Sequence, residues 1–121
     1  MSLINDTARR KKTTVAKITS KDELDKIKAY IQGAVYCWCK NNDGWFFAGD
    51  LFGGKNWDWT GTPIASLWAW HNKRRPKDAV DMAGKDAGVI LKEVLKSDAR
   101  IFTTEKAKRR GFPMSRYKWI K

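Results

Sequence analysis

The chain has 121 residues and a mass of 13.9 kDa, a length that fits one domain rather than two. Hydrophobic residues make up 42% of it, which argues against a disordered chain, and no apolar run approaches the length of a membrane-spanning helix. Its 25 basic and 13 acidic side chains give a formal net charge of +12. Charged residues rather than an apolar run follow the first positions, so we expect no secretory signal and a cytoplasmic protein.

The positive charge is concentrated at the two ends of the chain. Residues 1–21 carry six basic groups and one acid, and residues 100–121 carry eight basic groups and one acid. The 78 residues between these ends carry eleven groups of each sign and are neutral as a whole. A neutral body with two basic ends predicts contact with a polyanion at defined points rather than over the whole surface.

Residues 1–19 are predicted to form a flexible basic arm, and residues 20–121 a single domain. The arm lacks apolar periodicity and contains a run of four consecutive basic residues, Arg9, Arg10, Lys11 and Lys12. Arms of this kind add phosphate or minor-groove contacts in DNA-binding proteins. The alternative is a solvated tail that only aids solubility.

The first predicted helix covers residues 21–40. Ser20 and Glu23 form a capping-box pattern at its start, and apolar side chains then recur at the helical period. A second interpretation stays open for its end, because Gly33 interrupts the pattern. In that interpretation residues 34–39 form a strand that pairs with residues 45–47 through an Asp-Gly turn.

The residue pattern in the middle of the chain predicts short secondary-structure elements followed by a second helix. Residues 45–47 fit a brief strand, residues 50–52 a single helical turn, and a loop follows. Thr62 as a cap and Pro63 as the first helical residue predict a helix over residues 63–73. The end of this helix is basic, with Lys73, Arg74 and Arg75. These three residues either complement the helix dipole or form a binding site.

The last third of the chain changes from helical to strand periodicity. Apolar residues over 77–97 keep the helical period, and Gly84 allows either one helix or two helices joined by a turn. Residues 100–103 and 116–120 alternate as strands do, and residues 104–115 are predicted to be a long basic connection between them. The predicted fold class is therefore α+β, mainly α with a C-terminal β-hairpin.

From residue 77 onward the chain resembles a winged helix-turn-helix DNA-binding domain. Val80, Gly84 and Ile90 have the spacing of an apolar residue, a turn glycine and an apolar residue in that motif. A hairpin with a cationic loop follows at once, as the wing does in this family. The resemblance implies a winged-helix-like fold for residues 20–121 and binding to double-stranded DNA. Either helix 63–73 or helix 86–97 would then enter the groove.

These patterns favour a non-enzymatic nucleic-acid-binding protein, a small regulator or architectural factor of a microbe or its phage, with a homodimer as one candidate assembly. Two alternatives stay open. One is an RNA- or single-strand-binding module that stacks bases on Trp57 and Trp59, and the other is an adaptor that binds an acidic protein. The candidate nucleic-acid-binding residues are Arg9, Arg10, Lys11, Lys12, Lys73, Arg74, Arg75, Lys85, Lys92, Lys106, Lys108, Arg109, Arg110, Arg116 and Lys118.

The sequence offers little for catalysis or metal binding. His71 is the single histidine, and Cys37 and Cys39 lack both the spacing and the second pair of a zinc site. We therefore expect no catalytic residues, no metal and no cofactor. The two cysteines are interpreted as small buried thiols in a reducing compartment.

Six of the seven tryptophans divide into two groups, and the seventh, Trp70, falls outside the apolar face of the helix predicted over residues 63–73. Four lie on apolar stripes and are predicted to be core residues, namely Trp38, Trp45, Trp68 and Trp119. Trp57 and Trp59 flank an aspartate in a loop, where clamping of the loop onto the core is the simpler explanation and base stacking the alternative.

Overall fold

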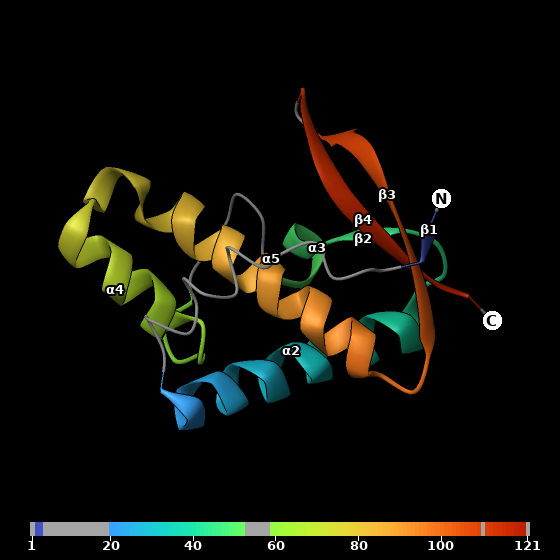
Figure 1. The fold of residues 1–121 in the computed structure, drawn as a ribbon, viewed down its shortest axis with the longest axis horizontal. Coiled ribbons are helices and arrows are strands. Elements are labelled where there is room, and N and C mark those ends of the chain that lie inside the picture. The colour runs from blue at the N-terminus through green and yellow to red at the C-terminus, as the bar shows by residue number, and fades with distance from the viewer. Residues whose placement is uncertain (1, 4–19, 53–58, 110, 121) are drawn as a thin grey trace.

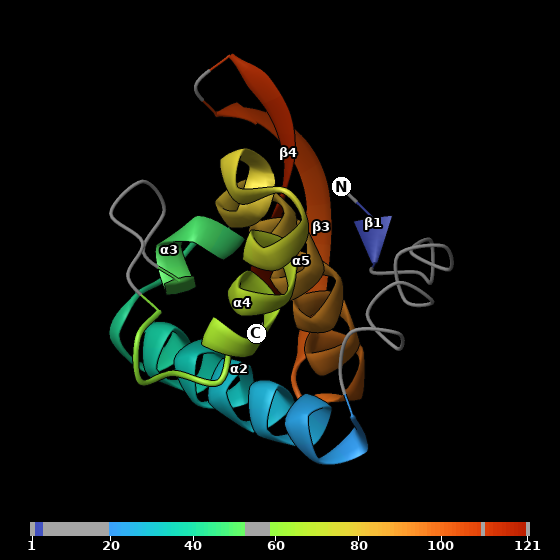
Figure 2. The same ribbon diagram turned by 90° about the vertical axis from the view of Figure 1, so that its left-hand side faces the viewer.

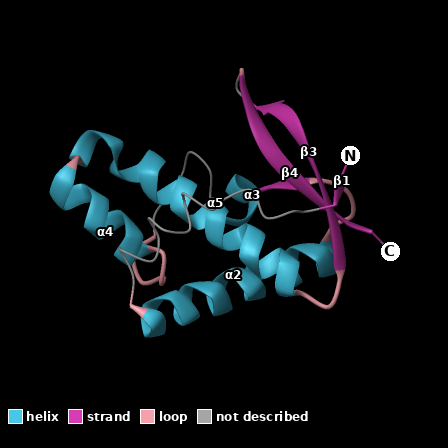
Figure 3. Cartoon of the chain, viewed as in Figure 1, coloured by secondary structure: helices cyan, strands magenta, loops and turns pink. Residues whose placement is uncertain are grey.

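The structure is a computed structural model, and it describes residues 2–3, 20–52, 59–109 and 111–120. Its helices are α2 (Lys21–Asn41), α3 (Ala48–Phe52), α4 (Ala65–Arg74), the 3-10 helix η2 (Pro76–Asp78) and α5 (Ala79–Ser97). Its strands are β1 (Ser2–Leu3), β2 (Phe46–Phe47), β3 (Ile101–Arg109) and β4 (Phe112–Ile120). The predicted α+β class, mainly α with a C-terminal hairpin, is confirmed, as Figure 3 shows.

Residues 34–39 belong to helix α2, so the alternative of a strand over these residues is wrong. The Ser20 hydroxyl accepts a hydrogen bond of 3.2 Å from the Glu23 backbone N–H and lies 3.3 Å from the Glu23 carboxylate. Its buried side chains recur every four residues, at Ile27, Ile31, Val35 and Cys39. A single apolar face therefore runs through Gly33 to the end of the helix.

The prediction that both cysteines are buried is wrong for Cys37. Cys39 is buried, whereas Cys37 is exposed on the same helix. Residues two positions apart in an α-helix point in nearly opposite directions. A helix with one buried face can therefore cover one of these thiols and not both.

Helix α4 begins two residues later than predicted. Thr62 and Pro63 form a turn before it, in which their carbonyl groups accept hydrogen bonds from the N–H groups of Ala65 and Ser66. The Thr62 hydroxyl does not cap the helix but donates a 2.8 Å hydrogen bond to the Trp59 carbonyl. The turn thus takes the place of the predicted first helical turn.

Helix α5 is continuous, so the turn that the winged-helix resemblance places at Gly84 is absent. Ala83, Ala87, Ile90 and Leu91 are all buried and keep one face of the helix against the core on both sides of this glycine. The two-helix interpretation of residues 77–97 is therefore wrong. The chain turns instead at residues 75–78, between α4 and α5, which lie side by side in Figure 2.

The strands form one antiparallel sheet in the order β1-β3-β4-β2. The predicted long connection at residues 104–115 is wrong, because β3 and β4 pair continuously from Ile101 with Ile120 to Arg109 with Phe112. Only two residues join the strands, and Gly111 has a φ of 83°, which glycine adopts without the steric penalty of a Cβ.

The two outer strands are short and cover only the base of this hairpin. Strand β1 pairs with Thr103 and Thr104, and β2 pairs with Arg116 and Tyr117. Beyond these residues β3 and β4 form a two-stranded ribbon, residues 105–115, that rises from the helices in Figure 1. Ser2–Leu3 belong to the sheet, and the rest of the predicted arm over 1–19, with Arg9 to Lys12, lies outside the described residues.

The core lies between the apolar faces of α2, α4 and α5 and the inner side of the sheet. Phe46, Phe102 and Tyr117 contribute the sheet side, and the Phe46 ring contacts both of the others. Three predicted core tryptophans, Trp38, Trp68 and Trp119, are half-buried and pack against this core. Trp45 is also half-buried but is not part of the core cluster.

Candidate nucleic-acid interface

The strand register divides the ribbon into two chemically different sides. Side chains alternate along each strand, so partners in the register share a side. Lys106 and Lys108 pair with Ser115 and Pro113 and lie on one side. The opposite side carries Phe112 and Met114, paired with Arg109 and Ala107.

Three lysines of the hairpin are exposed and are held by no other described residue. They are Lys106 and Lys108 on the ribbon and Lys118 at its base. No ion pair or hydrogen bond with the described part of the chain engages their ammonium groups. These predicted contact residues can therefore bind an anion without breaking an interaction with another described residue.

The two described arginines of the ribbon, Arg109 and Arg116, are engaged within the protein. The Nε atom of Arg116 donates a 2.8 Å hydrogen bond to the Glu105 carboxylate, and its Nη2 atom contacts the same oxygen. The Arg116 guanidinium also lies 4.6 Å from the centre of the Trp45 ring. Glu105 and Arg116 face each other across the strands, so this pair fixes the ribbon where it leaves the sheet.

Arg109 connects the far end of β3 to α3. Its Nη2 atom lies 3.2 Å from the Asp50 carboxylate, and its guanidinium carbon lies 4.9 Å from the centre of the Phe47 ring. Asp50 also accepts a 2.8 Å hydrogen bond from the Phe47 N–H, so the carboxylate is itself held in place. The Nη1 atom of Arg109 is buried without a partner among the described residues. Arg110, the next predicted contact, lies outside them.

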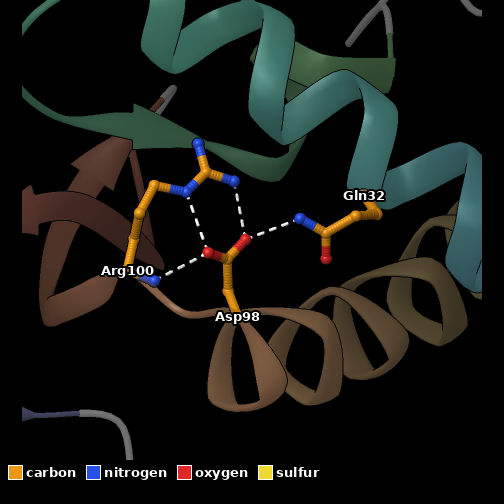
Figure 4. A network of polar contacts seen from close by, with 3 residues as sticks. All are labelled: Gln32, Asp98 and Arg100. Carbon is orange, nitrogen blue, oxygen red and sulfur yellow. Dashed lines mark hydrogen bonds and ion pairs between the residues drawn. The ribbon is translucent and has the colours of Figure 1, made fainter.

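A polar network anchors the base of the hairpin to the helices (Figure 4). Both Asp98 carboxylate oxygens accept hydrogen bonds from the Arg100 guanidinium, at 2.8 and 2.6 Å, and one also accepts the Arg100 backbone N–H. Gln32 of α2 donates a further bond of 2.6 Å to Asp98. The hydrogen bonds from Arg100 hold the pKa of the Asp98 carboxyl well below its usual range, although burial opposes them.

The predicted basic residues of the helices are less concentrated. Arg74 donates to the Trp70 carbonyl at 2.9 Å and its guanidinium lies 3.5 Å from the centre of the Trp70 ring, while Lys73 and Arg75 are exposed beside it. Lys85 forms an ion pair of 3.2 Å with Asp81. Lys92 is half-buried and has an interaction of its own.

The two basic groups lie at different ends of α5. The Lys73 to Arg75 cluster precedes the N-terminal end of this helix, and the ribbon follows its C-terminal end (Figure 1). The structure therefore does not join all the predicted residues into one patch; the hairpin lysines form the more concentrated group.

A buried hydrogen-bonded pair joins α4 to α5 and was not predicted from the sequence. The Nε2 atom of His71 lies 2.6 Å from an Asp86 carboxylate oxygen, and the two side chains are only 7% and 6% exposed. The sequence signal was an acid between Ala83 and Ala87, on the face that the helical period assigns to the core. A lone histidine on the facing apolar stripe was its natural partner.

Within the described ranges, no group of three or more His, Cys, Asp or Glu side chains is arranged to hold a metal ion. Trp59 is buried and its Nε1 atom donates to the Phe52 carbonyl at 3.1 Å, which confirms the loop-clamping prediction for this residue. Trp57 lies outside the described residues.

Comparison with protein-family models, with curated proteins and with solved structures finds no significant match for this chain. Across the described residues, none of the helices combines the length and apolar character needed to cross a membrane. The function of this chain is therefore inferred from the geometry of the hairpin and the charges around it.

Proposed function

We propose that this protein is a non-enzymatic nucleic-acid-binding protein that grips duplex DNA with the β3–β4 ribbon. The observation that carries this proposal is the projecting ribbon with exposed lysines that no described residue engages. Protein charge placed on a projection, away from internal acids, is free to neutralise phosphates and release their counterions. The same charge spread over the body would be partly cancelled by the acids there.

The shape of the ribbon supports a duplex as the partner. The major groove of B-DNA admits a two-stranded β-ribbon, and phosphates line both of its edges. Lys106 and Lys108 lie two residues apart on one side of β3, and Lys118 lies on β4 near the base, on the other side. A ribbon lying in a groove would bring these lysines to the phosphates along its two edges, while the engaged Arg109 and Arg116 keep it stiff.

A winged helix-turn-helix mode would use the helix pair α4 and α5, with the turn at residues 75–78 in place of Gly84. In this mode the ribbon acts as the wing and α5, which contacts β3, is the helix closest to the DNA. Lys85 on the solvent side of α5 and the Lys73 to Arg75 cluster would add phosphate contacts. The run from Arg9 to Lys12 would add others.

A salt titration on random-sequence duplex DNA tests the proposal. We expect binding that weakens on the order of a thousandfold between about 50 and 200 mM salt if six or more phosphates are contacted. Replacing Lys106, Lys108 and Lys118 by alanine should lower the slope of log K against log salt by about three and weaken binding at least tenfold.

The matched control removes the same charge from α2, with alanine at Lys21, Lys26 and Lys28. These lysines lie near the start of α2, on the opposite side of the molecule from the ribbon (Figure 1). Binding that survives the ribbon variant, or falls equally in the control, would contradict the proposal. Stronger binding to single strands than to duplex, or competition by polyglutamate but not by DNA, would favour the two alternative functions.

A further inference from the structure

We propose that Phe112 and Met114 at the tip of the ribbon form an apolar wedge that inserts between base steps of duplex DNA and bends it. The inference rests on the proposed function, because it names what the tip does once the lysines have engaged the phosphates. It makes the protein a DNA-bending factor rather than a passive binder.

The first observation is the exposure of these two side chains at the end of a projection. Phe112 is 70% exposed, the highest fraction among the exposed large hydrophobic residues of the described chain, and Met114 is 39% exposed. Phe112 has no ring contact with another described residue. Isolated exposed hydrophobic residues are ordinary, but Phe112 and Met114 share one side of the ribbon tip and form a patch that a partner can bury.

The second observation is the placement of charge around this patch. Phe112 and Met114 share one side of the ribbon, and Lys106 and Lys108 occupy the other. A partner that suits both sides has a negatively charged surface beside a flat apolar one. The duplex has both, because phosphates border each groove and the faces of the base pairs become accessible when a step unstacks. Phe, Met and Pro are among the side chains that DNA-bending proteins insert at such steps.

The third observation is that the tip is tied to the body of the protein. Arg109, the register partner of Phe112, is held by Asp50 and the Phe47 ring, and Glu105 is bound to Arg116 lower on the ribbon. A wedge must resist the force with which the base pairs restack. These contacts supply that resistance on the same side of the ribbon as Phe112 and Met114.

An end-to-end distance measurement on a short duplex of about 30 base pairs, labelled with a fluorescent donor and acceptor, tests the wedge. With saturating wild-type protein, energy transfer should rise to the level of a bend of about 20 to 90°. The Phe112→Ala/Met114→Ala variant should still bind, within about fivefold of the wild type, and leave the duplex straight. 2-Aminopurine placed in the duplex should brighten on unstacking with the wild type and not with the variant.

The matched control is Ile101→Ala/Ile120→Ala. These two residues are also exposed, face each other across the strands and lie on the same side of the hairpin, but at its base. The control should bend DNA as the wild type does. Circular dichroism checks that both variants fold. We expect them to fold because the four replaced side chains are exposed.

The outcomes separate the wedge from the proposed function. A wild-type complex that forms without bending, or a tip variant that still bends DNA, overturns the wedge and leaves DNA binding intact. No complex with duplex at low salt overturns the proposed function and the wedge together. Binding to anionic lipid vesicles that requires Phe112, with no distortion of DNA, overturns the wedge in favour of a membrane contact.

Discussion

Asp98 and Arg100 lie two residues apart at the junction of α5 and β3, where the aspartate binds both the guanidinium and the backbone N–H of the arginine. The Arg100 guanidinium also lies 5.5 Å from the Phe102 ring centre and 5.6 Å from that of Trp119. Gln32 joins the same carboxylate from α2. One aspartate thus fixes the direction in which the hairpin leaves the helices.

Removing the charge of Asp98 should destabilise the fold. We expect Asp98→Asn to lower the free energy of unfolding by about 2–4 kcal/mol, because it leaves a largely buried guanidinium without its counter-charge. Urea unfolding at neutral pH measures the change. Asp25→Asn, which breaks an exposed ion pair of 3.1 Å with Lys21, is the control and should cost less than about 1 kcal/mol. Equal effects of the two variants would contradict this role.

The same carboxylate predicts a loss of stability in acid. The pKa of Asp98 is lowered in the folded protein, so the unfolded chain binds its proton first as the pH falls. The stabilisation is therefore complete above the unfolded pKa of about 3.9 and is lost progressively below it. Urea unfolding at a series of pH values should show a steeper decline below about pH 4 in the wild type than in Asp98→Asn. Parallel curves would contradict the assignment.

Alanine at Gly84 or Gly88 should stabilise the protein. A Cβ at either position meets nothing within 4 Å, and both residues lie inside α5. Alanine avoids the entropic cost of glycine in a helix, so each change should raise the free energy of unfolding by about 0.5–1 kcal/mol. Thermal or urea unfolding measures it. Destabilisation by either variant would mean that the glycine meets a neighbour that the described residues do not show.

The buried pair of His71 and Asp86 should behave as one unit. Alanine at Asp86 leaves a buried imidazole nitrogen without this hydrogen-bond partner, so we expect a loss of about 1–3 kcal/mol. His71→Ala should cost a similar amount, and the double variant less than the sum of the two. A double-mutant cycle in urea gives the coupling energy. Additive effects would show that the two side chains stabilise the fold independently.

The two thiols should react at different rates, because Cys37 is exposed and Cys39 is buried. One thiol per chain should react rapidly with a disulfide reagent in the native protein, and two in denaturant. Cys37→Ser should remove the rapid phase, whereas Cys39→Ser should retain it. Rapid reaction of both thiols in the native state would contradict the position of Cys39 in the core.

The helices were predictable because burial repeats along them. The four-residue spacing from Ile27 to Cys39 marks the buried face of α2, and the same period carries α5 through Gly84. At Gly84 the sequence left a turn open beside the continuous helix, because glycine inside a helical pattern is a local break signal. Tertiary burial of Ala83 and Ala87 outweighs that local preference.

The ribbon was not predictable from local patterns. Residues 104–115 are rich in lysine and arginine and contain glycine and proline, which are typical of a loop. They form strands because each pairs with a residue of the other strand, and the Glu105–Arg116 pair reinforces that register. The engagement of Arg109 by Asp50 joins positions that are remote in sequence, so no spacing rule could reveal it.

The ion pair between Arg109 and Asp50 should limit local opening of the ribbon more than it contributes to the free energy of unfolding of the whole protein. Arg109→Met keeps an apolar stem beside Phe47 but removes the ion pair, which is partly exposed, so unfolding should change by less than about 1 kcal/mol. Backbone amides of residues 105–109 should nevertheless exchange with deuterium about fivefold faster, because local opening of the ribbon no longer has to break this contact. Amides in α5 serve as the internal control and should be unchanged. Equal exchange in the ribbon of both proteins would mean that the strand pairing alone holds the tip in place.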